Sequence, residues 1–396
     1  MKYNFDEIVN RRNTYSVKWD GGELLTAMGL TDRFDEETLP LFTADMDLPV
    51  PEPLVEALHK TVDHRIFGYS IFPSEYYEAI QHWFKKRHDW EIQKEEIVYC
   101  PGTVYATNIA VKALTEPGDG VIIQRPVYPP FTRAIVENDR TLLNNRLICD
   151  KDGYYTIDFE DFEAKARDEK TKLFILCNPH NPTGRIFSHD DLKKLSDICA
   201  KHDVILVADE IHGDIIRSNQ TFTPIAMVAD KTDHIITFTA INKTFNLAGL
   251  HCTNVIISNP ELRKKFSEAI GMKSASPFTV AALISVYRDG EEWLEQLKEY
   301  LDGTMAWVVQ FVKERLPKVK VSIPEGTYVM WMDFSGYGIS PKEVHERIYN
   351  RANVLLQDGV MFGQEGLEHQ RICIPSPRPM IKEAMERIAR EFEDLH

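Results

Sequence analysis

Two side chains that could carry Schiff-base chemistry follow apolar segments of the chain. Lys243 comes just after IITFTA (235–240), and Asp209 is the last residue of VILVAD (204–209). A lysine in apolar surroundings loses solvation, so its amine gives up a proton more easily and can react with an aldehyde. A carboxylate at the end of a buried strand can hold a protonated ring nitrogen in the crevice where α/β proteins bind ligands. Taken alone, a lysine after a strand is most often a solvated surface charge, and an aspartate there is equally compatible with a turn or a helix cap.

Two loops offer hydrogen-bond donors for the rest of such a ligand. NPHNPTG follows the apolar segment LFILC, and the amide of its Asn181 could donate to a phenolic oxygen. CPGTVYATN joins another apolar segment to a helical pattern, and backbone N–H groups at a helix start form a natural phosphate site. The residues at this helix start are Gly102, Thr103 and Val104. By themselves these segments are also ordinary Pro/Gly/Asn loops.

A flat side chain completes the set. Tyr128, in QRPVYPPF, could lie against an aromatic ring, although a core tyrosine is equally compatible with its local sequence. Pyridoxal 5′-phosphate (PLP) needs a lysine for its aldehyde, a carboxylate at its pyridine nitrogen, a phosphate cradle, a donor to its phenolic oxygen and a flat group on its ring. The sequence offers a candidate for each need and therefore predicts PLP as cofactor.

The elements that position these residues alternate between strands and helices. Several of the predicted strands are continuously apolar, as expected for strands that helices cover on both faces. Helical patterns such as VYATNIAVKAL and DLKKLSDICAKH lie between them, which predicts an α/β domain with a mostly parallel sheet. The predicted strands are residues 96–100, 121–124, 173–177, 204–209, 235–240 and 254–258.

The pattern changes after about residue 288. A long amphipathic helix (293–316) precedes several strands, and a final helix begins at Pro379. This predicts a second, smaller α/β domain that includes the N-terminal segment, with the large domain spanning 46–288 and the small one 1–45 and 289–396. The strands predicted here are KVSI (320–323), TYVMWMDF (327–334), VLLQ (354–357) and RICI (371–374).

Charge and composition exclude several classes of function. A formal net charge of −15 argues against a nucleic-acid partner and, more weakly, against docking on an anionic membrane. The N-terminus has charges throughout and no apolar signal region, and no apolar run approaches the roughly 20 residues of a membrane helix. The six cysteines form neither a disulfide framework nor a zinc spacing, so we expect free thiols in the cytoplasm and no bound metal.

The order of the candidate residues resembles a known superfamily. Gly102–Thr103, Tyr128, Asn181, Asp209 and Lys243, with a separation of 34 positions between the last two, are similar to the motifs of fold-type-I PLP enzymes of the class I/II aminotransferase superfamily. The resemblance covers nearly the whole chain. It implies an aspartate aminotransferase-like fold, in which a large PLP domain has a mostly parallel, mixed seven-stranded sheet flanked by helices. It also implies a cis peptide bond between Asn181 and Pro182.

Other segments resemble one branch of that superfamily, the MalY/PatB-type carbon–sulfur β-lyases, which are cystathionine β-lyase-like. These segments are RRNTYSVKWD (11–20), PLFTADMDLPVP (40–51), FGYS (67–70), ADEIHGD, KTFNLAGL and the tail FGQEGLEHQRICIPSPR. In ADEIHGD, His212 stands where aminotransferases usually have a tyrosine, and it is expected among the cofactor-binding residues.

The resemblance also assigns roles around the substrate. Arg371 is expected to grip the α-carboxylate of a small amino-acid substrate, bordered by Asn181 and Tyr128, because a guanidinium pairs with a carboxylate through two hydrogen bonds. Tyr69, in FGYS, is expected to reach the phosphate site of the neighbouring subunit. The resemblance therefore implies a homodimer with shared active sites.

The chain departs from its relatives at two places. Ala240, Ile241 and Asn242 precede the lysine where hydroxyl residues often help to hold the phosphate, and Thr239 or Thr244 could compensate. Cys373 stands where an asparagine is frequent after the carboxylate-binding arginine. Both departures bear on substrate preference and leave the expected fold intact.

The predicted activity is cleavage of the Cβ–S bond of L-cystathionine or a related cysteine thioether. Lys243 would act as the general base that removes the Cα proton. An aminotransferase acting on a small or aromatic amino acid is the alternative, because it shares the same first steps and motifs. A non-catalytic regulator that keeps the fold is a further alternative, against which the presence of Lys243 and Asp209 speaks.

Overall fold

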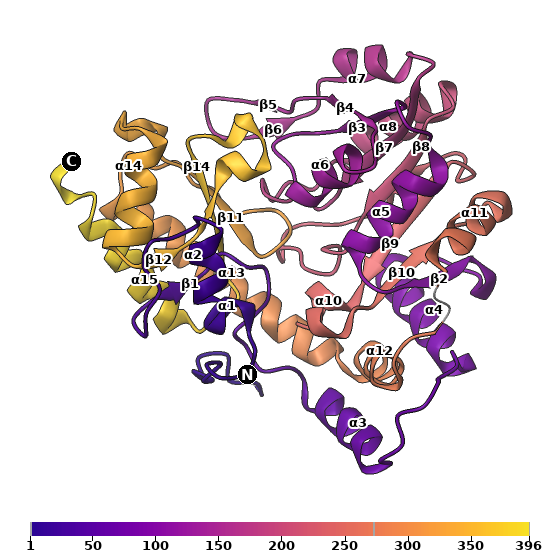
Figure 1. Ribbon diagram of the computed structural model, residues 1–396, viewed down its shortest axis with the longest axis horizontal. Helices are drawn as coiled ribbons and strands as arrows, with labels where there is room; N and C mark the ends of the chain where they lie inside the picture. The colour runs from indigo at the N-terminus through magenta and orange to yellow at the C-terminus, as the bar shows by residue number, and fades with distance from the viewer. Residues whose placement is uncertain (1, 272–273, 396) are drawn as a thin grey trace.

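A seven-stranded sheet carries the loops that hold most of the candidate residues (Figure 1). The computed structural model describes residues 2–271 and 274–395. All neighbouring strands run parallel except β10, which is antiparallel to both of its neighbours, so the sheet is mixed but mostly parallel, as predicted. Across the sheet the order is β2 (Ile97–Cys100), β10 (Thr253–Ile256), β9 (Ile235–Ala240), β8 (Ile205–Asp209), β7 (Thr171–Cys177), β3 (Gly120–Ile123) and β4 (Thr141–Asn144).

Helices cover both faces of this sheet because its strands are apolar on both sides. Val121 and Ile123 pack against one group of helices, whereas Ile122 between them packs against the other group. This alternation follows from the two-residue period of a strand. The first group is α5 (Thr103–Leu114), α6 (Pro129–Val136) and α11 (Pro260–Ile270), and the second is α7 (Phe159–Ala166), α8 (His189–Lys201) and α9 (Ile225–Val228).

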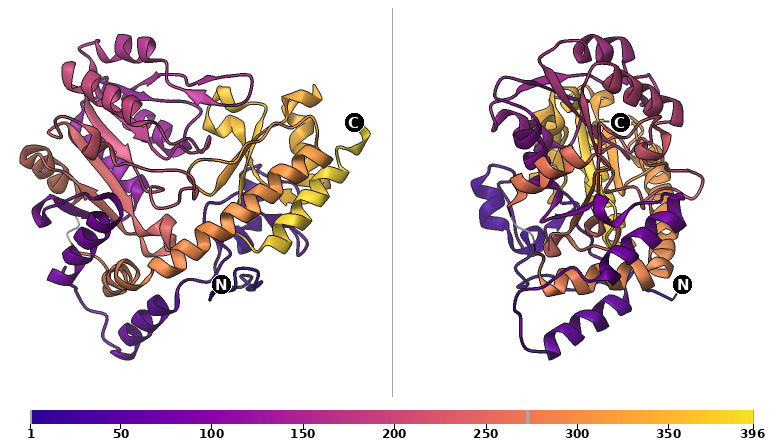
Figure 2. Two further views of the ribbon diagram at one scale, coloured as in Figure 1. Left: turned by 180° about the vertical axis from the view of Figure 1, so that it is seen from behind. Right: turned by 90° about the vertical axis from the view of Figure 1, so that its right-hand side faces the viewer.

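A smaller antiparallel sheet lies in the C-terminal part of the chain (Figure 2). Its strand order is β11 (Val329–Asp333), β14 (His369–Cys373) and β13 (Gln357–Asp358), and its residues share a core with α13 (Glu291–Arg315) and α15 (Arg378–Arg390). The N-terminal segment joins this part, because β1 (Leu39–Pro40) pairs in parallel with β12 (Val354–Leu355).

Further elements connect these layers. Several of them border the candidate site, in particular α1, α2 and α10. They are α1 (Val17–Asp20), α2 (Gly22–Ala27), α3 (Glu52–Asp63), α4 (Ser74–His88), β5 (Ile148–Cys149), β6 (Tyr155–Thr156), α10 (Ile241–Thr244), α12 (Pro277–Asp289) and α14 (Pro341–His345).

The six strands predicted for the large sheet are present, and three details differ from the prediction. The single predicted strand VLLQ (354–357) is divided between β12 and β13, which belong to different sheets. The structure adds the edge strand β4, which the sequence pattern did not indicate. The segment KVSI (320–323) is not a strand, since Lys320 forms one isolated bridge with Asp333. The bond from Asn181 to Pro182 is cis, as predicted, and so are Arg125–Pro126 and Asn178–Pro179.

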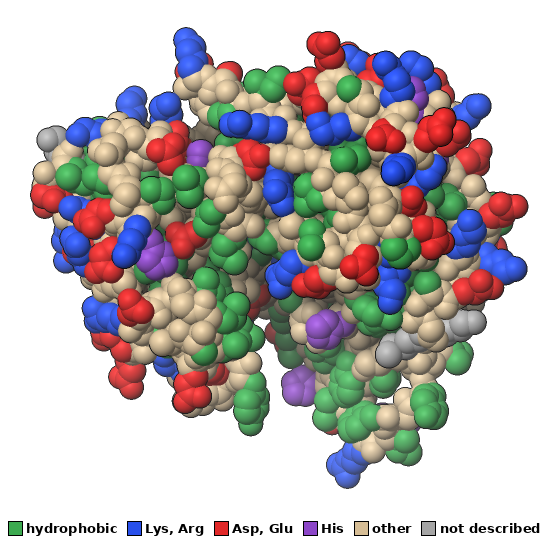
Figure 3. Space-filling view, turned by 45° about the horizontal axis from the view of Figure 1, so that its top comes forward, with side chains coloured by type: hydrophobic (Ala, Val, Ile, Leu, Met, Phe, Trp, Pro, Cys, Tyr) green, Lys and Arg blue, Asp and Glu red, His purple; other side chains and the backbone are tan. Residues whose placement is uncertain are grey.

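The surface mixes charges of both signs across the face shown in Figure 3, and apolar side chains gather along a hollow between its two halves. Within residues 2–271 and 274–395, every helix is too short or too polar to cross a membrane.

Candidate active site

The candidate residues meet where neighbouring parallel strands end. β7, β8 and β9 lie side by side, so their carboxyl ends open at one edge of the sheet, and the segments that follow them carry the candidate residues. A cavity of about 320 Å³ lies at this edge. The residues expected from the sequence that line it are Tyr128, Asn181, Asp209, His212, Lys243 and Arg371.

Lys243 lies in the short helix α10, directly after β9. Its Nζ donates a hydrogen bond to the carbonyl oxygen of Ala44 at 2.6 Å. Burial, and to a smaller degree the nearby guanidinium of Arg371, lowers the pKa of this amine below its ordinary value. The amine is therefore easier to deprotonate than a surface lysine, as a nucleophile or general base requires.

Asp209 is a buried carboxylate with few partners. It is 4% exposed, and the contact that it accepts from the protein is a backbone N–H of Ile211 at 3.3 Å. Burial raises the pKa of Asp209 to about 7. A cationic group in the cavity would offset the cost of burying this charge. The protonated pyridine nitrogen of PLP is such a group. The buried Asp209 carboxylate therefore fits the pyridine nitrogen of the cofactor.

Arg371 and Asn181 orient each other. Arg371 is buried, and its guanidinium donates to the Phe42 carbonyl at 2.8 Å and to Asn181 Oδ1 at 3.1 Å. Since a guanidinium can only donate, Asn181 turns its oxygen to Arg371 and keeps Nδ2 as a free donor. In the part of the chain that the structure describes, Arg371 pairs with no carboxylate, and its Nε has no hydrogen-bond partner. The α-carboxylate of an amino acid would supply the ion-pair partner of Arg371 and an acceptor for its Nε.

The helix start after β2 forms a second cavity of about 740 Å³ that shares Tyr128, Ile211 and Lys243 with the first. Gly102 precedes α5 with φ 113°, a conformation that suits glycine. The first N–H groups of a helix have no intrahelical acceptor, so those beginning at Thr103 and Val104 are available to an anion. Both residues line this cavity, as Gly102 does, and the arrangement fits a phosphate group.

The two threonines expected to compensate for the missing hydroxyls point elsewhere. Thr239 donates to the Asn254 carbonyl at 3.3 Å, and Thr244 donates to Asp214 Oδ2 at 3.0 Å. Neither lines the cavity at the helix start, whereas Asn242 does. Cys373 is buried, and its thiol donates to the Phe42 carbonyl at 3.5 Å, the same oxygen that Arg371 binds.

The last two expected residues lie in different surroundings. His212 lines the cavity with Lys243, packs edge-on against Tyr328, and is buried without a partner for its Nδ1 within residues 2–271 and 274–395. Burial lowers its pKa well below the ordinary value, so its ring is neutral. Tyr69 does not line this cavity. Its side chain is fully exposed and borders a separate hollow between α3 and α12.

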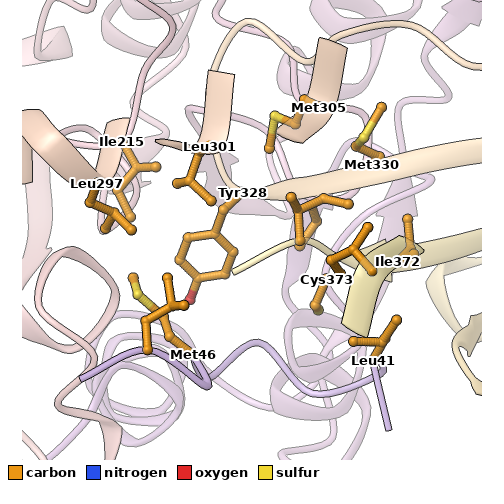
Figure 4. Close-up of a cluster of buried hydrophobic side chains, with 14 of the residues drawn as sticks. Leu41, Met46, Ile215, Leu297, Leu301, Met305, Tyr328, Met330, Ile372 and Cys373 are labelled. Atoms are coloured by element: carbon orange, nitrogen blue, oxygen red, sulfur yellow. The ribbon is translucent and has the colours of Figure 1, made fainter. Parts of the chain in front are cut away.

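Sequence reasoning did not identify the backbone oxygen that contacts the lysine. The Ala44 carbonyl accepts hydrogen bonds from both Lys243 Nζ and the Tyr328 hydroxyl, the latter at 2.9 Å. Tyr328 is fully buried in an apolar cluster that includes Met46, Ile215 and Leu301 (Figure 4). A backbone carbonyl leaves no side-chain signal in a sequence. The fold places this oxygen at the lysine, because the ADMD segment packs against Lys243.

Asp47 anchors this ADMD segment. Its carboxylate accepts from Lys18 Nζ at 2.6 Å, Arg11 Nη1 at 2.6 Å and Trp19 Nε1 at 2.8 Å. The Ser376 hydroxyl adds a fourth contact at 2.7 Å. The segment RRNTYSVKWD therefore folds onto ADMD through buried ion pairs. The opposite charges of these two segments are the sequence signal for this pairing.

Comparisons with known proteins agree with this geometry. The family description "Aminotransferase class I and II" matches residues 39–388. Cystathionine beta-lyase PatB of Bacillus subtilis is 40% identical over 97% of this chain and 98% of that protein, and Protein MalY of Escherichia coli is 30% identical over 97% of each. Cystalysin from Treponema denticola, whose crystal structure contains a pyridoxal 5′-phosphate cofactor, superposes with a TM-score of 0.94 at 36% identity over 100% of both chains.

Proposed function

The chain belongs to the class I and II aminotransferase family, and we propose that it is a PLP-dependent carbon–sulfur β-lyase. It would cleave L-cystathionine or a related cysteine thioether to a thiol, pyruvate and ammonia. The observation that carries this proposal is that the ADMD segment, typical of the lyase branch, contacts Lys243 directly through Ala44. The similarity to PatB over almost the whole of both chains supports it.

Four groups would hold the cofactor. Lys243 would hold its aldehyde carbon, Asp209 its pyridine nitrogen, Asn181 Nδ2 its phenolic oxygen, and the backbone amides of Thr103 and Val104 its phosphate. When bound, PLP supplies a ring that accepts the electron pair left at Cα. The buried Asp209 carboxylate, which has no cationic partner in direct contact within the described chain, gains such a partner in this arrangement.

The remaining chemistry belongs to side chains around the substrate. Arg371 pairs with the α-carboxylate and so fixes the Cα–H bond relative to Lys243. The Lys243 amine takes the Cα proton, and the Ala44 carbonyl accepts a hydrogen bond from the ammonium that results. The Cβ–S bond then breaks and the thiolate leaves with its electron pair. Water hydrolyses the released enamine to pyruvate and ammonia.

One assay separates this proposal from an aminotransferase. Purified protein with PLP and L-cystathionine, but without any 2-oxo acid, should release homocysteine, pyruvate and ammonia in equal amounts. An aminotransferase needs a 2-oxo acid acceptor and leaves the Cβ–S bond intact. If alanine, aspartate or an aromatic amino acid is transaminated with much higher kcat/KM than any thioether is cleaved, the lyase proposal is wrong.

We further propose a homodimer in which Tyr69 of one subunit reaches the phosphate site of the other. Three exposed apolar neighbours support an interface here, since Ile66, Phe67 and Ile71 are 71%, 57% and 79% exposed in the single chain. Light scattering at assay concentration tests this proposal, because a monomer with full activity would end it.

Two further proposals concern the domain boundaries and the cellular location of the protein. The pairing of β1 with β12 supports a small domain made of 1–45 and 289–396 beside a large domain of 46–288. The six cysteines are free thiols, which supports a cytoplasmic location.

A further inference from the structure

We propose that the enzyme prefers cysteine thioethers whose sulfur carries an apolar group over those, such as cystathionine, whose sulfur carries a charged one. This inference rests on the proposed lyase function and narrows its substrate class. It concerns the part of the Lys243 cavity that remains once Arg371 is assigned to the α-carboxylate, and Lys243, Asp209 and Asn181 to the cofactor.

Most of the remaining wall of this cavity is apolar, with Thr43, Arg133 and Gln357 among its polar members. The N-terminal segment contributes Val17, Leu24 and Met28, while Pro129 and Met361 line it from other elements. Leu24 and Met28 are four residues apart at α2 and its C-terminal cap, so they lie on one side of it.

The apolar side chains of this wall are also accessible. Val17, Leu24 and Met28 are 55%, 52% and 60% exposed, although each is large and apolar. Single exposed apolar residues are ordinary, but these three share one cavity with the catalytic lysine. A substrate group placed against them would remove apolar surface from water, which favours binding.

The charges around the cavity oppose an ammonium group. Among the described residues that line it, the carboxylate is Asp209, which is committed to the pyridine nitrogen. Lys243, Arg371 and the exposed Arg133 are basic. The ammonium at the far end of cystathionine would therefore meet basic groups and apolar carbon, without a free carboxylate among the described residues that line the cavity. Placing a charge in such surroundings is unfavourable.

The reaction is the same for every such substrate, so one product reports on all of them. R–S–CH₂–CH(NH₃⁺)–COO⁻ and one water give R–SH, pyruvate and NH₄⁺. The Cα proton goes to Lys243, the Cβ–S electron pair leaves with the sulfur, and no oxidant or reductant is consumed.

Three thioethers test the preference in the holoenzyme. S-butyl-L-cysteine and S-(3-aminopropyl)-L-cysteine have the same number of heavy atoms and differ in one terminal group, a methyl or an ammonium. L-cystathionine is the third. We expect kcat/KM for pyruvate release from the butyl compound to exceed the other two about ten-fold or more.

The outcomes separate the two proposals. Equal or faster cleavage of the aminopropyl compound or of cystathionine overturns the inference and leaves the lyase function standing. Pyruvate from none of the three overturns the lyase function, and the inference with it.

A substitution tests whether the N-terminal wall is responsible. Met28→Glu places a carboxylate at the wall, so the aminopropyl-to-butyl ratio of kcat/KM should rise about ten-fold. Met227→Glu is the matched control, because Met227 is 40% exposed in α9 and does not line this cavity. Circular dichroism checks that both variants fold. An unchanged ratio in Met28→Glu, or an equal change in the control, contradicts the assignment of the wall.

Discussion

Two regions next to Lys243 each contain a buried aspartate, and they treat it in opposite ways. Asp47, in the N-terminal segment, and Asp209, at the end of β8, are both 4% exposed. Asp47 accepts hydrogen bonds from Lys18, Arg11, Trp19 and Ser376, and its pKa is lowered because the ion pair with Lys18 outweighs burial. Asp209 accepts one long backbone contact, and burial raises its pKa to about 7.

This contrast separates a structural carboxylate from a ligand-binding one. Asp47 has its charge neutralised and its lone pairs occupied by the protein itself, so it braces the ADMD segment. Asp209 is desolvated without a compensating cation in contact among residues 2–271 and 274–395, which is tolerable where a bound group supplies that cation. Equal burial therefore has different meanings, and the partners of the carboxylate distinguish them.

The largest effect is expected at Asp47, where a substitution should lower the free energy of unfolding. Asp47→Asn leaves Lys18, which is 1% exposed, facing a neutral amide. Removing one partner of a buried pair costs about 3–5 kcal/mol of unfolding free energy, which urea denaturation measures. Glu292→Gln, in the exposed pair with Lys2, is the control and should change the free energy by less than about 1 kcal/mol. Similar values for the two variants would contradict the bracing role.

Asp209→Asn should instead act on catalysis. The amide cannot stabilise the pyridinium charge, so kcat should fall about 100-fold, equivalent to about 2.7 kcal/mol. The unfolding free energy of the cofactor-free protein at neutral pH should not fall, because a charge without a partner in contact has been removed. Stopped-flow or steady-state pyruvate release gives kcat. A variant with unchanged kcat would remove Asp209 from the site.

The pH dependence of stability should differ in sign between the two aspartates. Between its ordinary pKa of 3.8 and about 7, folded Asp209 keeps a proton that the unfolded chain has lost. Its contribution to stability thus falls as pH rises through this window, by up to about 1.4 kcal/mol per pH unit. Asp47, with a lowered pKa, contributes stability above its ordinary pKa and loses it as pH falls.

Urea titrations of the cofactor-free protein from pH 4 to pH 7 measure this slope. The stability of the wild type relative to Asp209→Asn should decline across that range, and saturation with PLP should abolish the decline. If the stability of the wild type relative to Asp209→Asn rises with pH instead, Asp209 already has a cationic partner in the protein.

The smallest expected effect lies where the two regions meet. Tyr328→Phe removes one of two donors to the Ala44 carbonyl and should cost about 1 kcal/mol of stability. Lys243 then becomes the main donor to that oxygen, which favours its charged form, so the acid limb of the kcat profile should move to higher pH. Tyr337→Phe is the control, because its buried hydroxyl has no partner in the described chain. Equal behaviour of the two variants would contradict this role of Ala44.

Part of the candidate site and most of the large sheet could be predicted from the sequence. The Asn181, Asp209 and Lys243 loops were predictable, because each follows its own continuous apolar strand and parallel strands open at one edge. β4 was not, because its residues Thr141–Asn144 form a short edge strand that is partly exposed and lacks a long apolar run.

Contacts between distant segments account for the rest. Thr239 and Thr244 are close to Lys243 in sequence, yet their hydroxyls face Asn254 and Asp214. The link from Arg371 to Asn181 joins residues 190 positions apart. Local sequence patterns predict elements and their ends well, but the partner of a buried polar group is set by how the elements pack.

We propose that Lys243 holds the cofactor at this edge of the sheet. Borohydride reduction of the PLP-bound protein, followed by proteolysis and mass spectrometry, tests it directly, with Lys264→Ala on the exposed face of α11 as a control that should label normally. We predict the pyridoxyl group on Lys243 and no specific labelling in Lys243→Ala. A pyridoxyl group on any other lysine of the wild-type protein would contradict it.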